Sequence, residues 1–482
     1  MVLSLWIFCN EAWMKTIYLK QKNIEWVGEE FGRAKLGDLR LTGRLMKLAK
    51  SMAKTPEASI AQATGVWKDA KGAYRFFDNE KVTMKKVLAT HQEETLKRMN
   101  REKVVLAVQD TTVLNLSGHE CTEGLGPIGT HEDGARGFIL HTTLAFDNEG
   151  KALGIIDAEC WARKAQEFGK SHRRQGRKLE EKESYKWLKS FEVTQELQKQ
   201  LKQTQVVVVA DREADFYDLL AKAGKKQGSA EILVRCCYNR RLSDSTDSRL
   251  WEVLCQQPAS GQLEIEVPRQ KGRKARQAQL TVRFREVILE PAWQKQKLGP
   301  LKLWAILVEE CNPPEGVEPL CWRLLTTIEI HSLQDALEKI QWYRLRWQIE
   351  VYHKILKTGC RIEEYQLQTL DRLTRVLGIA LVIAWRILLM SKVARQTPAQ
   401  PATQFIEETQ WKMLYLHFNP DVKLPTQAPP IKQILIWIAQ LGGFLARKND
   451  GFPGAQTLWK GFQKLNDLTC GYELFQTLQK CG

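Results

Sequence analysis

Two short apolar segments, VVLAVQD (residues 104–110) and VVVVAD (residues 206–211), decide the fold of this chain. Each is a run of aliphatic, mostly β-branched residues, which is typical of a strand buried on both faces. Each run leads directly to an aspartate, Asp110 in the first segment and Asp211 in the second. The sequence therefore predicts two buried strands that end on carboxylates.

The segments around these strands complete a mixed sheet. FILHTTLAF (138–146) and ALGIIDAEC (152–160) are two more predicted strands with a turn between them, and EILVRCC (231–237) is a fifth. The stretches at 180–203 and 214–223 have the charge and apolar spacing of helices that cover a sheet. We expect a mixed α/β core with helices on its faces.

Residues 238–330 interrupt this pattern. Their short segments alternate between apolar and polar residues and are punctuated by Gly and Pro, which predicts an antiparallel β insertion. Residues 24–100 are predicted to be helical, and so is the chain from residue 332 almost to its end. The apolar run at 376–390 is shorter than a membrane span and is predicted to be a buried helix.

The composition favours a negatively charged partner. Of 482 residues, 72 are Lys or Arg and 56 are Asp or Glu, which gives a formal net charge of +16. Such a field attracts nucleic acid, although charge alone is equally compatible with an unrelated basic enzyme. The 11 cysteines have no metal-ligand spacing, so we interpret them as core residues of a protein in the reducing cytoplasm.

Asp110 and Asp211 are the first candidates for a functional site. A buried strand fixes the position of each residue, while the carboxylate reaches the sheet edge, where solvent and a cation can enter. Two carboxylates on neighbouring strands can coordinate Mg²⁺, a hard cation that takes oxygen ligands. Aspartate also commonly ends strands as a turn former, so neither residue is decisive alone.

The segment QWYRLRWQIEVYHKILKTG (341–359) supplies a third carboxylate. At 100° per residue, one predicted helix face carries polar and charged groups: Tyr343, Arg346, Glu350, Lys354 and Lys357. The opposite face is apolar and is predicted to be buried: Leu345, Ile349, Tyr352 and Leu356. A solvated face with i,i+4 ion pairs explains the charges but not Tyr343 and Trp347 on or beside the exposed stripe. A surface that binds phosphates and stacks on bases explains both.

The spacing of Tyr343, Arg346, Glu350 and Lys357 resembles the Y-x2-R-x3-E-x6-K signature of bacterial insertion-sequence DDE transposases, in particular the cut-and-paste members. Further motifs of that pattern occur in order along most of the chain: LGDLRLTGRL (36–45), GAYRFF (72–77), QDTT (109–112), ADREAD (210–215), WRLLTT (322–327), LGGFLARK (441–448) and LWKGF (458–462).

The resemblance implies an RNase H-like catalytic core in which Asp110, Asp211 and Glu350 form the DDE triad. These residues would hold two Mg²⁺ ions, which Mn²⁺ could replace, and the ions would act together in phosphoryl transfer. Water would nick the end of the element, and the freed 3′-OH would form a hairpin on the opposite strand. After water reopens the hairpin, the same 3′-OH would join target DNA.

The resemblance also implies a set of DNA contacts. The residues concerned are Tyr343, Arg346, Trp347, Lys354, Lys357, Trp322, Arg235, Arg40, Arg44 and Arg75. Arg346, Lys354 and Lys357 would clamp phosphates of the transposon end. Trp322, expected at the tip of the insertion, would stack on a base flipped out during hairpin formation, and Arg235 and Trp347 would hold the distorted strand. The three N-terminal arginines would recognise the end.

These inferences divide the chain into three expected domains. Residues 1–98 form a helical DNA-binding domain, and residues 99–385 form the RNase H-like catalytic domain with its insertion at about 238–330. Residues 386–482 form a helical dimerisation domain. The first 13 residues fit no part of this pattern, so the chain could start at Met1 or at Met14.

The expected partners are double-stranded DNA, as inverted-repeat ends and as target, and a second copy of the chain in the synaptic complex. We expect neither a membrane nor a small-molecule substrate, and we expect the protein to act on the nucleoid in the bacterial cytoplasm. Two other functions stay open. One is an RNase H-like nuclease or resolvase that cleaves without joining strands, and the other is a non-catalytic DNA-binding protein derived from a transposase.

Overall fold

The computed structural model describes residues 25–129, 133–165, 168, 178–224, 228–243, 249–267, 275–448 and 450–481. The question of whether the chain starts at Met1 or Met14 therefore lies outside the described residues.

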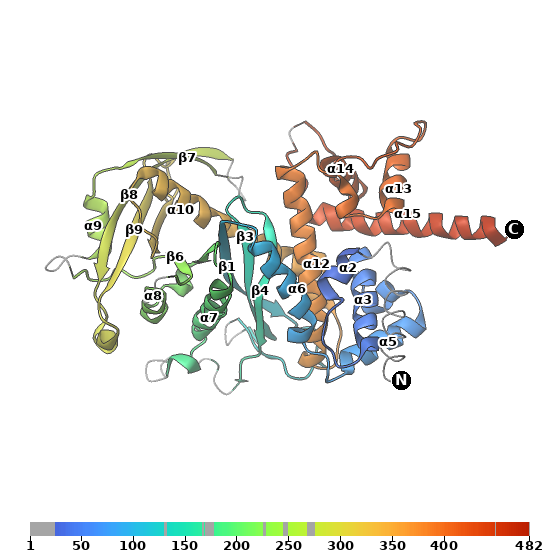
Figure 1. The fold of residues 1–482 in the computed structure, drawn as a ribbon, viewed down its shortest axis with the longest axis horizontal. Coiled ribbons are helices and arrows are strands. Elements are labelled where there is room, and N and C mark those ends of the chain that lie inside the picture. The colour runs from blue at the N-terminus through green and yellow to red at the C-terminus, as the bar shows by residue number, and fades with distance from the viewer. Residues whose placement is uncertain are drawn as a thin grey trace, which may run out of the picture.

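A mixed sheet runs through the middle of the protein (Figure 1). Its strands are β1 (Val104–Asn115), β2 (Gly126–Pro127), β3 (Arg136–Asp147), β4 (Ala152–Trp161), β5 (Gln205–Ala210), β6 (Glu231–Arg235), β7 (Gly261–Val267), β8 (Arg276–Leu289), β9 (Leu301–Glu310) and β10 (Cys321–Thr326). They follow the order β2-β3-β1-β5-β6-β10-β9-β8-β7, and β4 pairs with β3. The five strands predicted for the core are all present.

The core of this sheet is RNase H-like. β3 lies antiparallel between β1 and β4, whereas β5 is parallel to β1 and β6 is parallel to β5. Alternate residues of β1 face opposite sides of the sheet, so Val105 joins one apolar cluster and Leu106 joins another. Both sides are covered by helices, which explains why the strand sequences are apolar throughout. The predicted mixed α/β, RNase H-like fold is confirmed.

The β insertion is antiparallel, as predicted, but it is not a separate unit. β10 pairs with β6 and β9 pairs with β10, so the inserted strands extend the core sheet at its edge. Helix α9 (Leu250–Gln256), which we did not predict, lies between β6 and β7. Trp322 is the second residue of β10 and pairs with Val308 of β9. The expectation that Trp322 lies at the tip of the insertion is therefore wrong, because that residue is part of the sheet.

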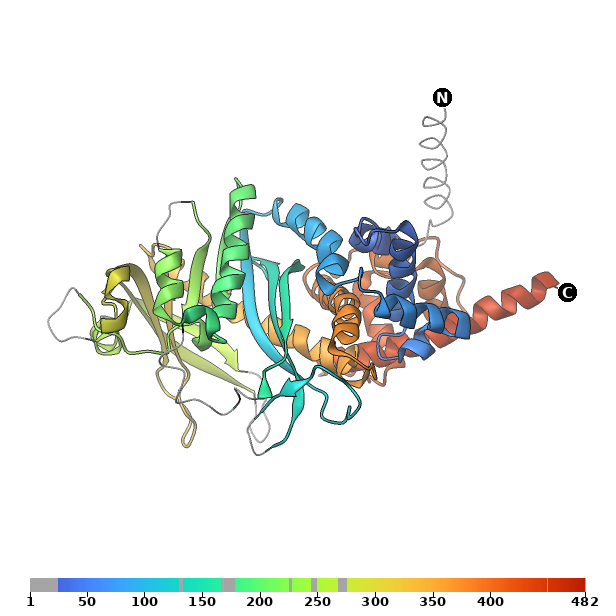
Figure 2. The same ribbon diagram turned by 90° about the horizontal axis from the view of Figure 1, so that it is seen from below.

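Helices occupy both ends of the sequence, as predicted for residues 24–100 and for the chain after residue 332. They are α2 (Glu25–Phe31), α3 (Leu39–Lys54), α4 (Ile60–Thr64), α5 (Trp67–Asp78), α6 (Met84–Met99), α10 (Leu333–Leu345), α11 (Trp347–Lys354), α12 (Leu370–Gln396), α13 (Glu408–Phe418), α14 (Ile431–Leu441) and α15 (Ala455–Cys481). Helices α7 (Tyr185–Gln200) and α8 (Tyr217–Ala223) belong to the core. Figures 1 and 2 show the first and last helices side by side at one end of the molecule, the insertion at the other end, and α15 projecting from the body.

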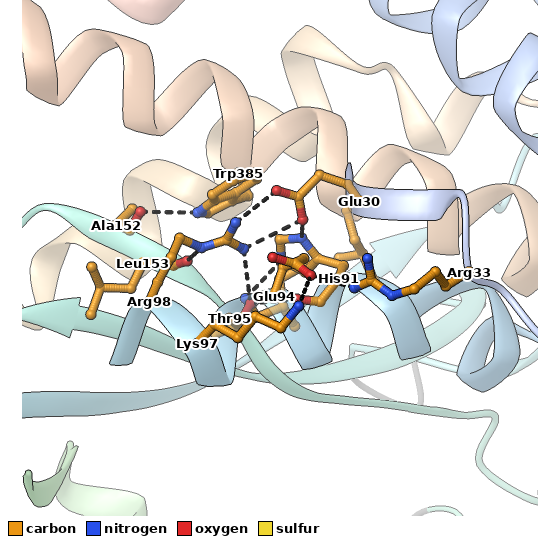
Figure 3. A network of polar contacts seen from close by, with 12 residues as sticks. Glu30, Arg33, His91, Glu94, Thr95, Lys97, Arg98, Ala152, Leu153 and Trp385 are labelled. Atoms are coloured by element: carbon orange, nitrogen blue, oxygen red, sulfur yellow. Dashed lines mark hydrogen bonds and ion pairs between the residues drawn. The ribbon is translucent and has the colours of Figure 1, made fainter. Parts of the chain in front are cut away.

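A buried polar network joins the N-terminal helices to the sheet (Figure 3). Glu30 on α2 accepts hydrogen bonds from His91 Nδ1 (2.5 Å) and Arg98 Nη1 (2.7 Å), both on α6. His91 Nε2 accepts the backbone N–H of Ile155 in β4 (3.0 Å), and the Arg98 guanidinium lies 4.6 Å from the ring centre of Trp385 on α12. These contacts fix α2, α6, β4 and α12 relative to one another.

Helix α12 contains the apolar run at 376–390. Within the described residues it is the one helix long and apolar enough to cross a membrane, yet 78% of its apolar window is buried inside the protein. It packs against α6, β4, α14 and the helices around them. The prediction of a buried helix is confirmed.

Candidate active site

Asp110 lies inside β1 rather than at its end. The strand continues to Asn115 because the residues beyond Asp110 stay paired with β3, where Asp110 itself stands opposite Thr142. The prediction that the strand ends at Asp110 is therefore wrong. Asp211 does follow the last residue of β5, and its carboxylate accepts a hydrogen bond from the backbone N–H of Glu213 (3.0 Å) in the turn that follows.

The parallel register of β1 and β5 brings the two aspartates together. Val108 of β1 pairs with Val209 of β5. The same register, continued for two residues, places Asp110 level with Asp211. Neighbouring strands lie about 4.8 Å apart, and residues at one level point to the same face of the sheet. Burial raises the pKa of Asp211, and the negative charge of Asp110 raises it further. The pair therefore forms a site of concentrated negative charge.

Arg346 connects Glu350 to this pair. Glu350 lies on α11, and its Oε1 accepts a hydrogen bond from Arg346 Nη2 (2.6 Å). Burial alone would lower the pKa of Arg346, but the nearby Tyr343, Glu350 and Asp110 raise it above its ordinary value. The positive charge of Arg346 also counteracts the rise in the pKa of Asp211. One guanidinium therefore acts on all three carboxylates.

The predicted single helix at 341–359 is divided into three parts. α10 ends at Leu345 and α11 begins at Trp347, and at the junction Arg346 N bonds to Tyr343 O (3.0 Å), a tight i to i+3 contact. A π turn follows at Ile355–Gly359. These changes of pitch rotate the side chains away from a uniform 100° spacing.

The apolar half of the helix prediction is confirmed, since its four residues are buried: Leu345, Ile349, Tyr352 and Leu356. The other half is partly wrong. Tyr343 is only 6% exposed, because it continues the buried face of α10 that includes Ala336 and Ile340. Trp347 is 60% exposed and Lys354 is also exposed, as predicted. Lys357 is half-buried, and its Nζ donates to the carbonyl of Val113 in β1 (2.5 Å).

Tyr343 meets two other predicted DNA contacts. Its ring centre lies 6.2 Å from that of Trp322 on β10. Burial raises the pKa of Tyr343, while the charges of Arg346 and Arg235 act in the opposite direction. Arg235 ends β6, and its Nη2 donates to the carbonyl of Cys321 (3.1 Å). The structure thus gathers these four side chains beside the carboxylates.

The N-terminal arginines lie elsewhere, on α3 and α5, at the end of the molecule that carries the first and last helices (Figures 1 and 2). Arg40 is the second residue of α3 and pairs with the helix cap, Asp38 (3.0 Å). Arg44 pairs with Asp69 on α5 (3.2 Å). Arg75 is exposed on α5. These residues form a surface separate from the carboxylates.

Two histidines near Asp110 were missed by the sequence interpretation. His353 Nδ1 lies 3.6 Å from Asp110 Oδ2. On the other side of the sheet, His141 Nδ1 lies 2.9 Å from the hydroxyl of Thr111, which follows Asp110. Burial lowers the pKa of His141 to about 3. The position of His353, three residues after Glu350, places it about 60° away on the helix and could have indicated a shared site.

The carboxylates fit a divalent cation only in part. Within the described residues, no three His, Cys, Asp or Glu side chains lie close enough together to hold a metal ion. Asp110 and Asp211 alone supply oxygen donors whose mutual repulsion a cation would relieve. Glu350 is bound to Arg346 and joins them only if that hydrogen bond is exchanged. Asp110 and Asp211 therefore fit Mg²⁺ as two of its ligands, and Glu350 could be a third only after its hydrogen bond to Arg346 is broken.

Comparison with known proteins gives three family matches along the chain. The model described as "Transposase DNA-binding" matches residues 23–82. "Transposase DDE domain" matches residues 189–386, and "Transposase Tn5 dimerisation domain" matches residues 382–480. Among solved structures, a piggyBac transposase synaptic complex with hairpin DNA is similar over 89% of this chain and 83% of that one, with 11% identity and a TM-score of 0.35.

Proposed function

This chain belongs to the Tn5-type DDE transposases, and on that premise we propose that it carries out cut-and-paste transposition through a hairpin intermediate. The family consists of metal-dependent enzymes that cut and join DNA. The chain carries a DNA-binding and a dimerisation domain, so its coarse function is that of a DNA transposase. The proposal adds the residues, the number of ions and the order of steps.

The observation that carries the proposal is the position of Arg346, which hydrogen-bonds Glu350 and whose charge acts on both Asp110 and Asp211. Asp110 and Asp211 stand level on adjacent parallel strands, and Glu350 reaches them from α11 through the Arg346 guanidinium. Strongly coupled, partly buried carboxylates are typical of catalytic sites. Two Mg²⁺ ions held by these acids would polarise the attacking oxygen and stabilise the leaving oxygen.

In the proposed reaction, the side chains position DNA while oxygen atoms exchange at phosphorus. Water attacks the phosphorus at the end of the element, and the 3′ oxygen leaves as a hydroxyl. That 3′-OH attacks the phosphorus that joins the opposite strand to flanking DNA, which forms a hairpin and releases the 3′-OH of the flanking DNA. Water then hydrolyses the hairpin phosphodiester and regenerates the 3′-OH of the element, which attacks target DNA and displaces a 3′-OH of the target strand. No step needs a covalent bond to the protein, which suits a site made of carboxylates and cations.

Arg346 would change partners during the cycle. In the free protein its Nη2 donates to Oε1 of Glu350, so this oxygen is directed toward the guanidinium. When Glu350 turns toward Asp110 and Asp211, the guanidinium becomes free to donate two parallel hydrogen bonds to a DNA phosphate. The exposed Lys354 and Trp347 on the same helix would extend this phosphate-binding surface.

The hairpin step requires a base to leave the stack. Trp322 is half-buried beside Tyr343, and the neighbouring Arg235 would hold the distorted phosphate backbone. Flipping a base costs a few kcal/mol, and stacking on an aromatic ring returns about 1–3 kcal/mol. Trp322 would offset part of the flipping energy in this way.

Three domains would divide the remaining work. We propose that residues 1–98 bind the inverted-repeat ends through Arg40, Arg44 and Arg75, and that residues 386–482 pair two copies in the synaptic complex. Residues 99–385 would catalyse the reaction on nucleoid DNA in the bacterial cytoplasm. The acids that pair with Arg40 and Arg44 would be replaced by phosphates when DNA binds.

The triad is tested by Asp110→Asn, Asp211→Asn and Glu350→Gln in the full-length chain, with end DNA carrying the inverted repeats that flank the gene. Each variant should lose nicking in Mg²⁺ and in Mn²⁺ and keep end binding, because phosphate contacts supply most of the affinity. Glu213→Gln is the matched control, since Glu213 is an exposed acid two residues from Asp211.

The outcomes separate the three candidate functions. Nicking that survives in any triad variant contradicts the assignment of that residue. Cleavage by the wild type without strand joining would favour an RNase H-like nuclease or resolvase. End binding without any cleavage, by a wild type tested in both metals, would favour a DNA-binding protein that no longer catalyses transposition.

A further inference from the structure

His353 occupies a position that neither the signature nor its spacing assigns. It lies on α11 one helical turn after Glu350 and is 5% exposed. Its Nδ1 is 3.6 Å from Asp110 Oδ2, and its Nε2 is 3.3 Å from the hydroxyl of Thr142. Thr142 is fully buried and stands opposite Asp110 in the pairing of β1 with β3. The imidazole therefore contacts both Asp110 and Thr142, which are cross-strand partners in β1 and β3.

We propose that His353 is a positioning residue that sets the orientation of the Asp110 carboxylate. Its Nδ1 would hold Oδ2, so that the other oxygen of Asp110 is presented to the side of Asp211. Thr142 would in turn fix the ring through Nε2. The inference rests on the proposed function, because it assumes that Asp110 helps to hold the cation.

The need for such a residue follows from the chemistry of aspartate. Rotation about the last side-chain torsion of aspartate is broad, so the strand fixes the backbone of Asp110 but leaves its carboxylate free to turn. The backbone N–H of Thr111 also donates to this carboxylate, but the Thr111 side chain gives no further support because its hydroxyl is engaged with His141. On the side of α11, His353 Nδ1 lies 3.6 Å from Asp110 Oδ2. His353 is therefore in contact with the carboxylate that it would orient.

The same contact also places the third acid. Glu350 and His353 lie one turn apart on α11, so the distance between His353 and β1 sets how far Glu350 stands from Asp110. α11 packs against β1 in the structure. A shortened side chain at position 353 would thus loosen the orientation of Asp110 and the approach of Glu350 together. Removing a group that orients a metal ligand typically lowers metal affinity or activity about 10- to 100-fold. We expect a loss of roughly that size here.

The test compares three substitutions that keep different atoms. In His353→Asn the amide nitrogen takes the place of Nδ1, which faces Asp110. In His353→Gln it takes the place of Nε2, which faces Thr142. His353→Ala removes both, and Thr142→Val is the matched control that leaves the Asp110 contact in place. Mn²⁺ binding to the full-length chain without DNA is measured by calorimetry, beside the Mg²⁺ dependence of end nicking and a melting curve.

The proposal expects His353→Ala to weaken Mn²⁺ binding roughly 10- to 100-fold. The Mg²⁺ concentration for half-maximal nicking should rise with it, whereas nicking at saturating Mg²⁺ should recover. His353→Asn should restore most of the Mn²⁺ affinity and His353→Gln should not. Thr142→Val should weaken binding less than His353→Ala does.

Two results would overturn the proposal. In one, all three variants at 353 bind Mn²⁺ like the wild type. In the other, Asn and Gln weaken binding equally and in proportion to a fall in melting temperature, as a purely structural residue would. An Asp110→Asn arm separates this failure from that of the proposed function. If Asp110→Asn also leaves Mn²⁺ binding intact, the metal site itself is wrongly assigned. If Asp110→Asn abolishes Mn²⁺ binding, the metal site stands and only the role given to His353 is wrong.

Discussion

Replacing Trp322 with alanine separates a catalytic tryptophan from a structural one. Trp322 is half-buried on β10, whereas Leu324 on the same strand is fully buried. Truncation of a fully buried Trp destabilises a protein by about 3–5 kcal/mol, so the partly exposed Trp322 should cost less, on the order of 1–3 kcal/mol. Loss of stacking on a flipped base removes about 1–3 kcal/mol from the hairpin step alone, a roughly 5- to 150-fold slower rate.

The assay is a denaturing-gel time course that resolves nicked, hairpin and double-end-break products. Trp322→Ala should bind ends and make the first nick at nearly the wild-type rate, and it should then accumulate nicked DNA. An abasic site at the flipped position should partly restore hairpin formation, because little stacking within the duplex remains to be broken. Trp322→Phe should fall between alanine and wild type.

Trp251→Ala is the matched control. Trp251 is also half-buried, but it lies on α9, where its ring packs against Arg323, the next residue of β10. Its loss should lower the melting temperature without changing the ratio of hairpin to nick. If Trp322→Ala instead behaves like Trp251→Ala, or loses the nick together with the hairpin, Trp322 is a core residue and the stacking argument fails.

Three further predictions concern charge. Lys354→Ala should reduce the slope of log affinity for end DNA against log salt by about one. Lys357→Ala should reduce this slope less and should also destabilise the fold, because Lys357 Nζ donates to the carbonyl of Val113. Salt titrations and melting curves check both variants. Arg75→Ala should weaken binding of end DNA and leave the Mn²⁺ affinity of the free chain unchanged, as calorimetry would measure. His91 is neutral in the fold, since its Nε2 accepts an N–H and burial lowers its pKa below the ordinary 6.5. Stability should therefore be complete above pH 6.5 and fall by up to about 1.4 kcal/mol per pH unit below it, and His91→Gln should flatten that part of a chemical-denaturation series.

The sheet was predictable because burial on two faces leaves a simple pattern. VVLAV and VVVVA are apolar at every position, and both form central strands. The end of β1 was not predictable in the same way. Asp110 is of a residue type that commonly ends strands, but pairing with β3 carries the strand on to Asn115. Tertiary pairing, and not local composition, decides where this strand ends.

The candidate site was predictable as far as helical spacing holds. The apolar stripe of 341–359 was correct, but the tight junction at Arg346 and the π turn after Lys354 change the pitch in opposite senses. Tyr343 lies before both changes and is buried because it continues the buried face of α10. The spacing of His353 from Glu350 was the available signal, but the contacts of His353 with Asp110 and Thr142 follow from the packing of α11 on β1 and β3, which the sequence does not show.

The insertion lies beside the candidate site because its strands continue the core sheet. The carboxylates lie on β1, after β5 and on α11, at the middle of the strand order, while the inserted strands extend the sheet from β6 outward. Because β10 pairs directly with β6, Trp322 and Arg235 are brought to the carboxylates by backbone hydrogen bonds of the same sheet. A base-stacking residue on a flexible appendage would need to be ordered at each hairpin step, with a loss of conformational entropy. If Trp322 stacks on a flipped base, as proposed, its place in the sheet avoids that loss, because the residue is already held in position before DNA binds.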